Sequence, residues 1–94
     1  MEFRDDFINP IYEGKKVCTT RMGKQADCND VLNVSFFKIL ITGVVKLKLA
    51  DAIEIYYISE GFDTMQEFYN CIISLYPKVT LDDYVYVHKF QVIT

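Results

Sequence analysis

The sequence predicts one mixed α and β domain spanning residues 1–94: mainly strands, arranged as a small β-barrel of about five to six strands covered by one main helix. Three observations lead to this fold class. Ninety-four residues are enough for a single hydrophobic core. The chain is 51% hydrophobic and 15% aromatic, which is typical of a strand-rich core. Apolar residues repeat at helical spacing without interruption in one segment, residues 64–75.

The N-terminal segment has an interrupted helical pattern. Its apolar residues are spaced four apart on one face, at Phe3, Phe7 and Ile11. We expect a break at Asn9-Pro10, because a residue before proline is disfavoured in the helical region. A new turn would then begin with Asn9 as its cap and end at Gly14. A short strand over residues 17–21 follows, and then a polar loop over residues 22–30.

The middle of the chain alternates like β-strands. Leu32 to Phe36 has a period of two, and the apolar run continues to Ile41. Thr42-Gly43 predicts a turn, after which residues 45–49 and 53–55 alternate again and predict two further strands.

The C-terminal third has the clearest pattern. Thr64 and Glu67 have the spacing of a capping box, apolar residues follow at helical spacing, and Pro77 ends the helix. Alternation from Tyr84 to Ile93 predicts the last strand.

Charge and cysteine content exclude several classes of function. A net charge of −3 gives no overall field for a polyanion or an anionic membrane, so any contact with nucleic acid must be local. No apolar run approaches the roughly 20 residues of a membrane span, and we expect a cytoplasmic protein without membrane contact. The three cysteines Cys18, Cys28 and Cys71 lack metal-ligand spacing, so we expect reduced thiols, no metal and no cofactor.

Four motifs in order resemble the ASCH domain, a PUA-like β-barrel family, over nearly the whole chain. They are Gly14-x-Lys16-x-x-Thr19-x-Arg21, Asn29-Asp30-x-Leu32-x-Val34, Glu60-Gly61-Phe62 followed by Glu67-Phe68, and Val87-x-x-Phe90. The small bacterial members that the chain resembles most include amidohydrolases acting on N(4)-acetylcytidine. The resemblance implies the catalytic set Lys16, Thr19 and Glu60 and a small nucleoside substrate. The chain departs from these enzymes at Val17, Asn29 and His88.

The chemistry of this set leaves the base open. Threonine is a poor nucleophile unless a base takes its proton. Lys16 can accept it only in its neutral form, which positive neighbours such as Lys15 or Arg21 favour and Glu60 opposes. Lys16 could instead stabilise an oxyanion while Glu60 transfers protons. Residues three apart face opposite sides of a regular strand, so Lys16 and Thr19 converge only if the backbone turns between them.

Arg21, Lys15 and His88 are the candidate substrate-binding residues. Arg21 could hold a phosphate or carboxylate, or could pair with Asp27 or Glu60, and a buried core histidine is the simpler interpretation of His88. The alternative function is a non-catalytic module that binds RNA or a nucleotide through the cluster of Lys15, Lys16, Arg21 and Lys24. A third is a partner-binding protein whose surface includes Tyr56, Tyr57 and Tyr84. The oligomeric state stays open.

Overall fold

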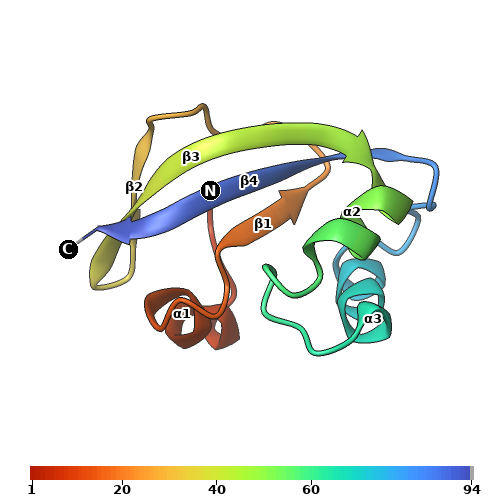
Figure 1. Cartoon of the computed structure of the whole chain (residues 1–94), viewed down its shortest axis with the longest axis horizontal. Helices are drawn as coiled ribbons and strands as arrows, with labels where there is room; N and C mark the ends of the chain where they lie inside the picture. The colour runs from red at the N-terminus through yellow and green to blue at the C-terminus, as the bar shows by residue number, and fades with distance from the viewer. Residues whose placement is uncertain (94) are drawn as a thin grey trace.

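The computed structural model describes residues 1–93 and contains four strands and three helices. Their order is α1 (Asp5–Tyr12), β1 (Cys18–Arg21), β2 (Val31–Val34), β3 (Phe37–Lys48), α2 (Leu49–Tyr56), α3 (Met65–Leu75) and β4 (Tyr84–Ile93). All strand pairs are antiparallel, and the strand order is β1-β4-β3-β2. Figure 1 shows a curled sheet with the helices on one side of it. The α+β class is therefore confirmed, with four strands rather than five or six.

The expected turn at Thr42-Gly43 was wrong, because β3 passes through it. Ile41 pairs with Phe90 while Gly43 pairs with Lys89, so Thr42 is an extra residue in the ladder. This irregularity is a bulge, which bends a strand without ending it. The ten-residue strand β4 offers pairing partners on both sides of the bulge, and β3 therefore continues to Lys48. A two-residue turn at Ser35 and Phe36 separates β2 from β3 instead.

The strand expected at residues 53–55 was also wrong, because this segment is part of helix α2. Leu49, Ala52 and Ile53 are buried at the i, i+3 and i+4 positions of that helix. The loop before β4 fixes its start, since the amide of Leu49 donates to the carbonyl of Asp83 at 2.9 Å. A three-residue alternation is too short to separate a strand from a helix, and tertiary packing decides the outcome.

Helix α1 runs without a break through Pro10, contrary to the expected restart at Asn9. Its N-cap is Arg4, which makes no side-chain capping bond, and Asp5 and Asp6 occupy the first turn. Carboxylates at that end interact favourably with the helix dipole. Ile11 is fully buried in the core, so packing of the apolar face outweighs the local preference against helix before proline.

Two apolar clusters form the core and lie beneath different parts of the sheet. One includes Val85 and Val87 of β4 with residues of α2 and α3. The other includes Phe90 of β4, Ile39 and Ile41 of β3, and Ile11 of α1. Helix α3 begins as expected, with the Thr64 hydroxyl accepting a hydrogen bond from the amide of Glu67 at 3.1 Å. Helix α1 thus covers one part of the sheet, and α2 and α3 cover another. A cavity lies between α1 and α3.

Candidate functional site

A cavity of about 380 Å³ lies between the N-terminal segment, β1, the loop after α2, and α3. Polar side chains from β1 and the segment before it line one part of the cavity. Aromatic and other apolar side chains from the N-terminal segment, the loop after α2, and α3 line much of the rest. Lys16, Thr19 and Glu60, which the family resemblance groups together, all line this one cavity.

The end of α1 positions Lys16. Gly14 has a φ of +79°, a conformation that glycine adopts without steric cost and that ends the helix. The amides of Lys15 and Lys16 then both donate to the carbonyl of Pro10, at 2.9 and 3.0 Å. Lys16 precedes β1, so its side chain does not follow the alternation of the strand. It is 2% exposed, and its Nζ lies 4.7 Å from the centre of the Phe7 ring.

The loop after α2 brings Glu60 to the same place from the other side of the sequence. The amide of Val17 donates to the carbonyl of Ser59 at 2.7 Å, which fixes this loop beside the segment before β1. Gly61 has a φ of +94°, so the residue after Glu60 takes a conformation that favours glycine. Figure 1 shows the two segments adjacent, between α1 and α2.

Lys16 and Glu60 form a buried ion pair at the centre of the site. The Lys16 ammonium contacts Oε1 of Glu60, and both side chains are at most 3% exposed. The Lys16 ammonium also lies 3.5 Å from the backbone carbonyl of Glu60. The second carboxylate oxygen, Oε2, accepts a hydrogen bond from the Thr20 hydroxyl at 2.5 Å. An amine, a carboxylate and a hydroxyl therefore form one continuous buried network.

The hydroxyl bonded to Glu60 belongs to Thr20, which the sequence motifs did not single out. Thr19 also lines the cavity, but its hydroxyl accepts a hydrogen bond from Nε of Arg21 at 3.2 Å. Both threonines are 5% exposed, although neighbouring residues of a strand point to opposite faces. The sequence signal that was available is the pair of adjacent threonines three and four residues after Lys16.

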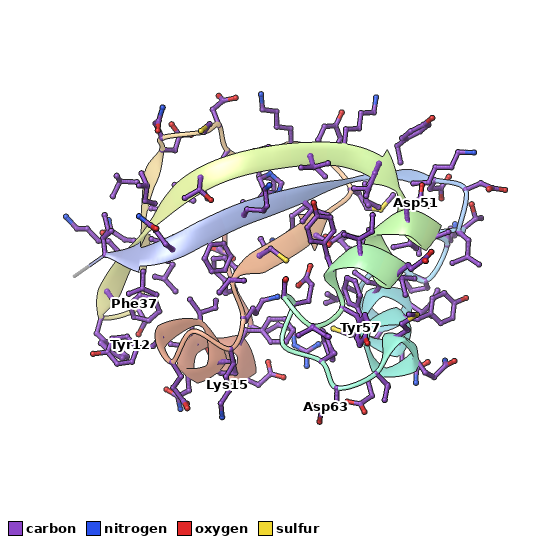
Figure 2. The ribbon with its side chains drawn as sticks, in the orientation of Figure 1. Tyr12, Lys15, Phe37, Asp51, Tyr57 and Asp63 are labelled. Atoms are coloured by element: carbon purple, nitrogen blue, oxygen red, sulfur yellow. The ribbon has the colours of Figure 1, made fainter. Side chains whose placement is uncertain are left out.

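The structure places the three candidate binding residues differently. Arg21 lines the cavity, and its guanidinium lies 5.2 Å from the centre of the Phe3 ring. Burial lowers the pKa of Arg21 from its ordinary value. Lys15 is exposed and pairs with Glu13 at 3.5 Å, outside the cavity lining. Figure 2 shows Lys15 at the outer edge of the molecule beside α1, away from the sheet.

His88 is fully buried and does not line the cavity. Its Nε2 accepts a hydrogen bond from the amide of Gln25 at 3.0 Å, which ties the polar loop after β1 to β4. Burial lowers the pKa of His88; the backbone groups of Thr19 and Tyr86 oppose this effect in part, and the positive charges of Arg21 and Lys24 add to it. A neutral imidazole that supports a loop fits these contacts.

The described residues offer no metal centre and no membrane span. Within residues 1–93, no three side chains of His, Cys, Asp or Glu gather in a way that could hold a metal ion. None of the three helices in this range is long and apolar enough to cross a bilayer.

Comparison with known proteins identifies the fold. No protein-family model matches the sequence, and no curated protein matches it. Among solved structures, a hypothetical protein, PH0355, superposes with a TM-score of 0.81 at 16% identity, over 99% of this chain and 96% of that one. An ASCH domain from Lactobacillus crispatus gives 0.69 at 16% identity, over 94% of this chain and 70% of that one.

A further ASCH protein shows the same likeness. A point mutant of ZmASCH from Zymomonas mobilis gives a TM-score of 0.73 at 14% identity, over 100% of this chain and 70% of that one. These likenesses confirm that the chain has the ASCH-like, PUA-like fold predicted from its motifs. At such low identity the likenesses concern the fold alone.

Proposed function

We propose that this protein is a small amidohydrolase that removes an acyl group from N(4)-acylated cytidine or a related nucleoside. The observation that carries the proposal is the buried network of Lys16, Glu60 and Thr20, with the Thr19 hydroxyl in the same cavity. Covalent catalysis requires a nucleophile that is hydrogen-bonded to a base and a third group that orients the base. The aromatic lining suits a planar base.

In the proposed reaction each group has a role that its contacts support. Oγ1 of Thr20 attacks the acyl carbonyl while Glu60 takes its proton. Glu60 then gives this proton to the departing amino nitrogen of cytosine, leaving an acyl ester on Thr20. Water hydrolyses the ester, and the products are the free nucleoside and the carboxylic acid. Lys16 holds Glu60 in place through its ammonium group.

Thr19 has a separate role in this scheme. The guanidinium of Arg21 occupies a lone pair of the Thr19 hydroxyl, so the hydroxyl proton is free to point toward another acceptor. In the proposed reaction, Thr19 donates this hydrogen bond to the oxyanion that forms on the acyl group. The Lys16, Thr19 and Glu60 set that the family resemblance implies stays in the proposal, but Thr20 replaces Thr19 as the proposed nucleophile.

The test is hydrolysis of N(4)-acetylcytidine, followed by chromatographic separation of cytidine. Glu60→Gln keeps the size of the side chain but removes its charge and replaces one acceptor oxygen with an amide donor, and we expect it to lower the rate by roughly 100-fold or more. Lys16→Met should also be impaired, while Lys15→Met is a matched control at an exposed neighbouring lysine. Circular dichroism checks that each variant is folded. Wild-type hydrolysis no faster than that of Glu60→Gln would reject the proposal.

The structure gives no specific support to the alternative of RNA binding through the basic cluster. Lys16 is buried against Glu60, and Lys15 and Lys24 pair with Glu13 and Asp27. Three of the four cations are therefore already paired with carboxylates. The four do not form a continuous basic surface of the kind that binds a phosphate backbone. RNA binding stays an untested prediction.

A further inference from the structure

We propose that the ligand of this cavity carries an anionic oxygen group, a phosphate or a carboxylate, that is held by Arg21. The inference rests on the proposed function in one respect: the ligand is taken to contain a flat ring. The anionic group of the ligand is inferred independently of that function. It is drawn from the charges and hydrogen-bond donors that the cavity leaves uncompensated.

Arg21 differs from its neighbouring cations in lacking a carboxylate partner. Arg4, Lys15, Lys16 and Lys24 each lie within 4.0 Å of a carboxylate oxygen. Among residues 1–93, no carboxylate oxygen lies this close to Arg21. The Glu60 carboxylate is already shared by Lys16 and Thr20. A partly buried charge without a counter-charge is costly, so an anion entering the cavity would gain a favourable interaction.

The hydrogen-bond donors of Arg21 are only partly used. Nε donates to Thr19, Nη1 to the side-chain oxygen of Gln25 at 3.5 Å, and Nη2 to the backbone carbonyl of Glu2. A guanidinium has five N–H groups, so these three bonds leave one on each Nη nitrogen. Two N–H groups of one planar guanidinium can donate to two oxygens of the same phosphate or carboxylate, which is bidentate binding.

The surroundings of Arg21 define the rest of the ligand. Phe3 and Phe7 line the cavity from the N-terminal segment and α1, and Phe62 and Phe68 line it from the loop after α2 and from α3. A volume of about 380 Å³ is near the lower end of the range for small-molecule sites. Arg4 also lines the cavity and brings a second positive charge, which it shares with Asp6. These features together fit a small ligand with a flat ring and one anionic group.

The test compares ligands that differ only in this group. Cytidine 5′-monophosphate is paired with cytidine for the phosphate, and N-acetylphenylalanine with its carboxamide for the carboxylate. Calorimetric titration should show roughly tenfold tighter binding of the charged member in at least one pair, as expected for hydrogen bonds to a charged group. Inorganic phosphate should compete if the phosphate pair shows the preference.

Variants of Arg21 then assign the preference to its guanidinium. Arg21→Gln should remove the preference, and Arg21→Lys, which keeps the charge but loses the fork, should reduce it. Lys24→Gln is the matched control because Lys24 is an exposed cation paired with Asp27. If Arg21 only fastens the N-terminal segment through Glu2 and Phe3, its variants will weaken both members of a pair equally.

The outcomes separate this inference from the proposed function. Equal affinity within both pairs, no measurable binding of either charged ligand, or a preference that survives in Arg21→Gln would overturn it. Hydrolysis of N(4)-acetylcytidine, with no preference for the charged member of either ligand pair, would leave the amidohydrolase standing and the anion site rejected. A phosphate preference that depends on Arg21, without any hydrolysis of N(4)-acetylcytidine, would support the anion site and reject the amidohydrolase.

Discussion

The Thr20 hydroxyl donates a 2.5 Å hydrogen bond to Oε2 of Glu60, forty residues away in the sequence, while Oε1 of the same carboxylate contacts Lys16. Glu60 therefore has both oxygens engaged inside the protein. Any proton that leaves the Thr20 hydroxyl has an acceptor already in place. Thr19, its neighbour, instead accepts a hydrogen bond from Nε of Arg21.

Loss of either threonine hydroxyl should slow hydrolysis, but only one of the two should carry the acyl group. Thr20→Val removes the proposed nucleophile, and we expect hydrolysis of N(4)-acetylcytidine to fall by roughly 100-fold or more, whereas Thr20→Ser keeps an oxygen and should retain activity. Thr19→Val should lower the turnover rate by roughly 100-fold through loss of one oxyanion donor. Only Thr20→Val should abolish a trapped acyl-enzyme detected by mass spectrometry. An acyl group found on Thr19 would contradict this assignment.

The buried ion pair should dominate the energetics of the site. Lys16→Met leaves the Glu60 carboxylate buried without its partner, and we expect the free energy of unfolding to fall by about 3–5 kcal/mol. The double variant Lys16→Met with Glu60→Gln removes both charges and should be more stable than Lys16→Met alone.

Chemical denaturation measures the free energy of unfolding of the wild type, the single variants and the double variant. An exposed ion pair provides the control. Lys15 and Glu13 are neighbours on the surface, where neutralising one partner should cost at most about 1 kcal/mol. A Lys16→Met variant that loses no more than Lys15→Met would show that the pair is not desolvated in solution.

The buried imidazole of His88 should make stability depend on pH. Burial holds the pKa of His88 below its ordinary value of 6.5 in the folded chain. As the pH falls below about 6.5, the unfolded chain takes up a proton that the folded chain does not, so the free energy of unfolding decreases. Above this pH both states are neutral at His88, and the effect disappears.

Urea unfolding at about pH 7.5 and about pH 5.5 tests this sign, because the window brackets the ordinary histidine pKa. The His88→Gln variant keeps a side-chain oxygen for the Gln25 amide but does not titrate. We expect the wild type to lose more stability than this variant between the two pH values. Equal losses would mean that His88 contributes nothing to the pH dependence.

The three thiols should react in a fixed order. Cys28 is exposed and should be modified first by an aromatic disulfide reagent. Cys71 lines the cavity, and burial raises its pKa, so it should react more slowly. Cys18 is 1% exposed, and burial raises its pKa also, so it should react only on unfolding.

Mass spectrometry of a time course assigns each thiol, with Cys28→Ser to confirm the fast phase. A ligand that occupies the cavity should slow modification of Cys71 and leave Cys28 unchanged, since only Cys71 lines the cavity. Fast reaction of Cys18 in the folded protein would contradict the packing of β1.

The sequence by itself determined the features that depend on neighbouring residues. The Thr64 cap and Pro77 define helix α3, and alternation defines β4, because these signals act within a few residues of where they occur. The family resemblance also grouped Lys16 with Glu60, and the structure brings these two side chains into contact.

Only the tertiary structure decided features that depend on distant partners. Residues 53–55 became helical because Ile53 packs into the core with Leu49 and Ala52, and β3 continued past Thr42 because β4 pairs with both halves of it. The same cause selected Thr20 over Thr19 as the partner of Glu60. A hydroxyl finds its acceptor through the position of a loop forty residues away, and local spacing along one strand carries no information about that loop.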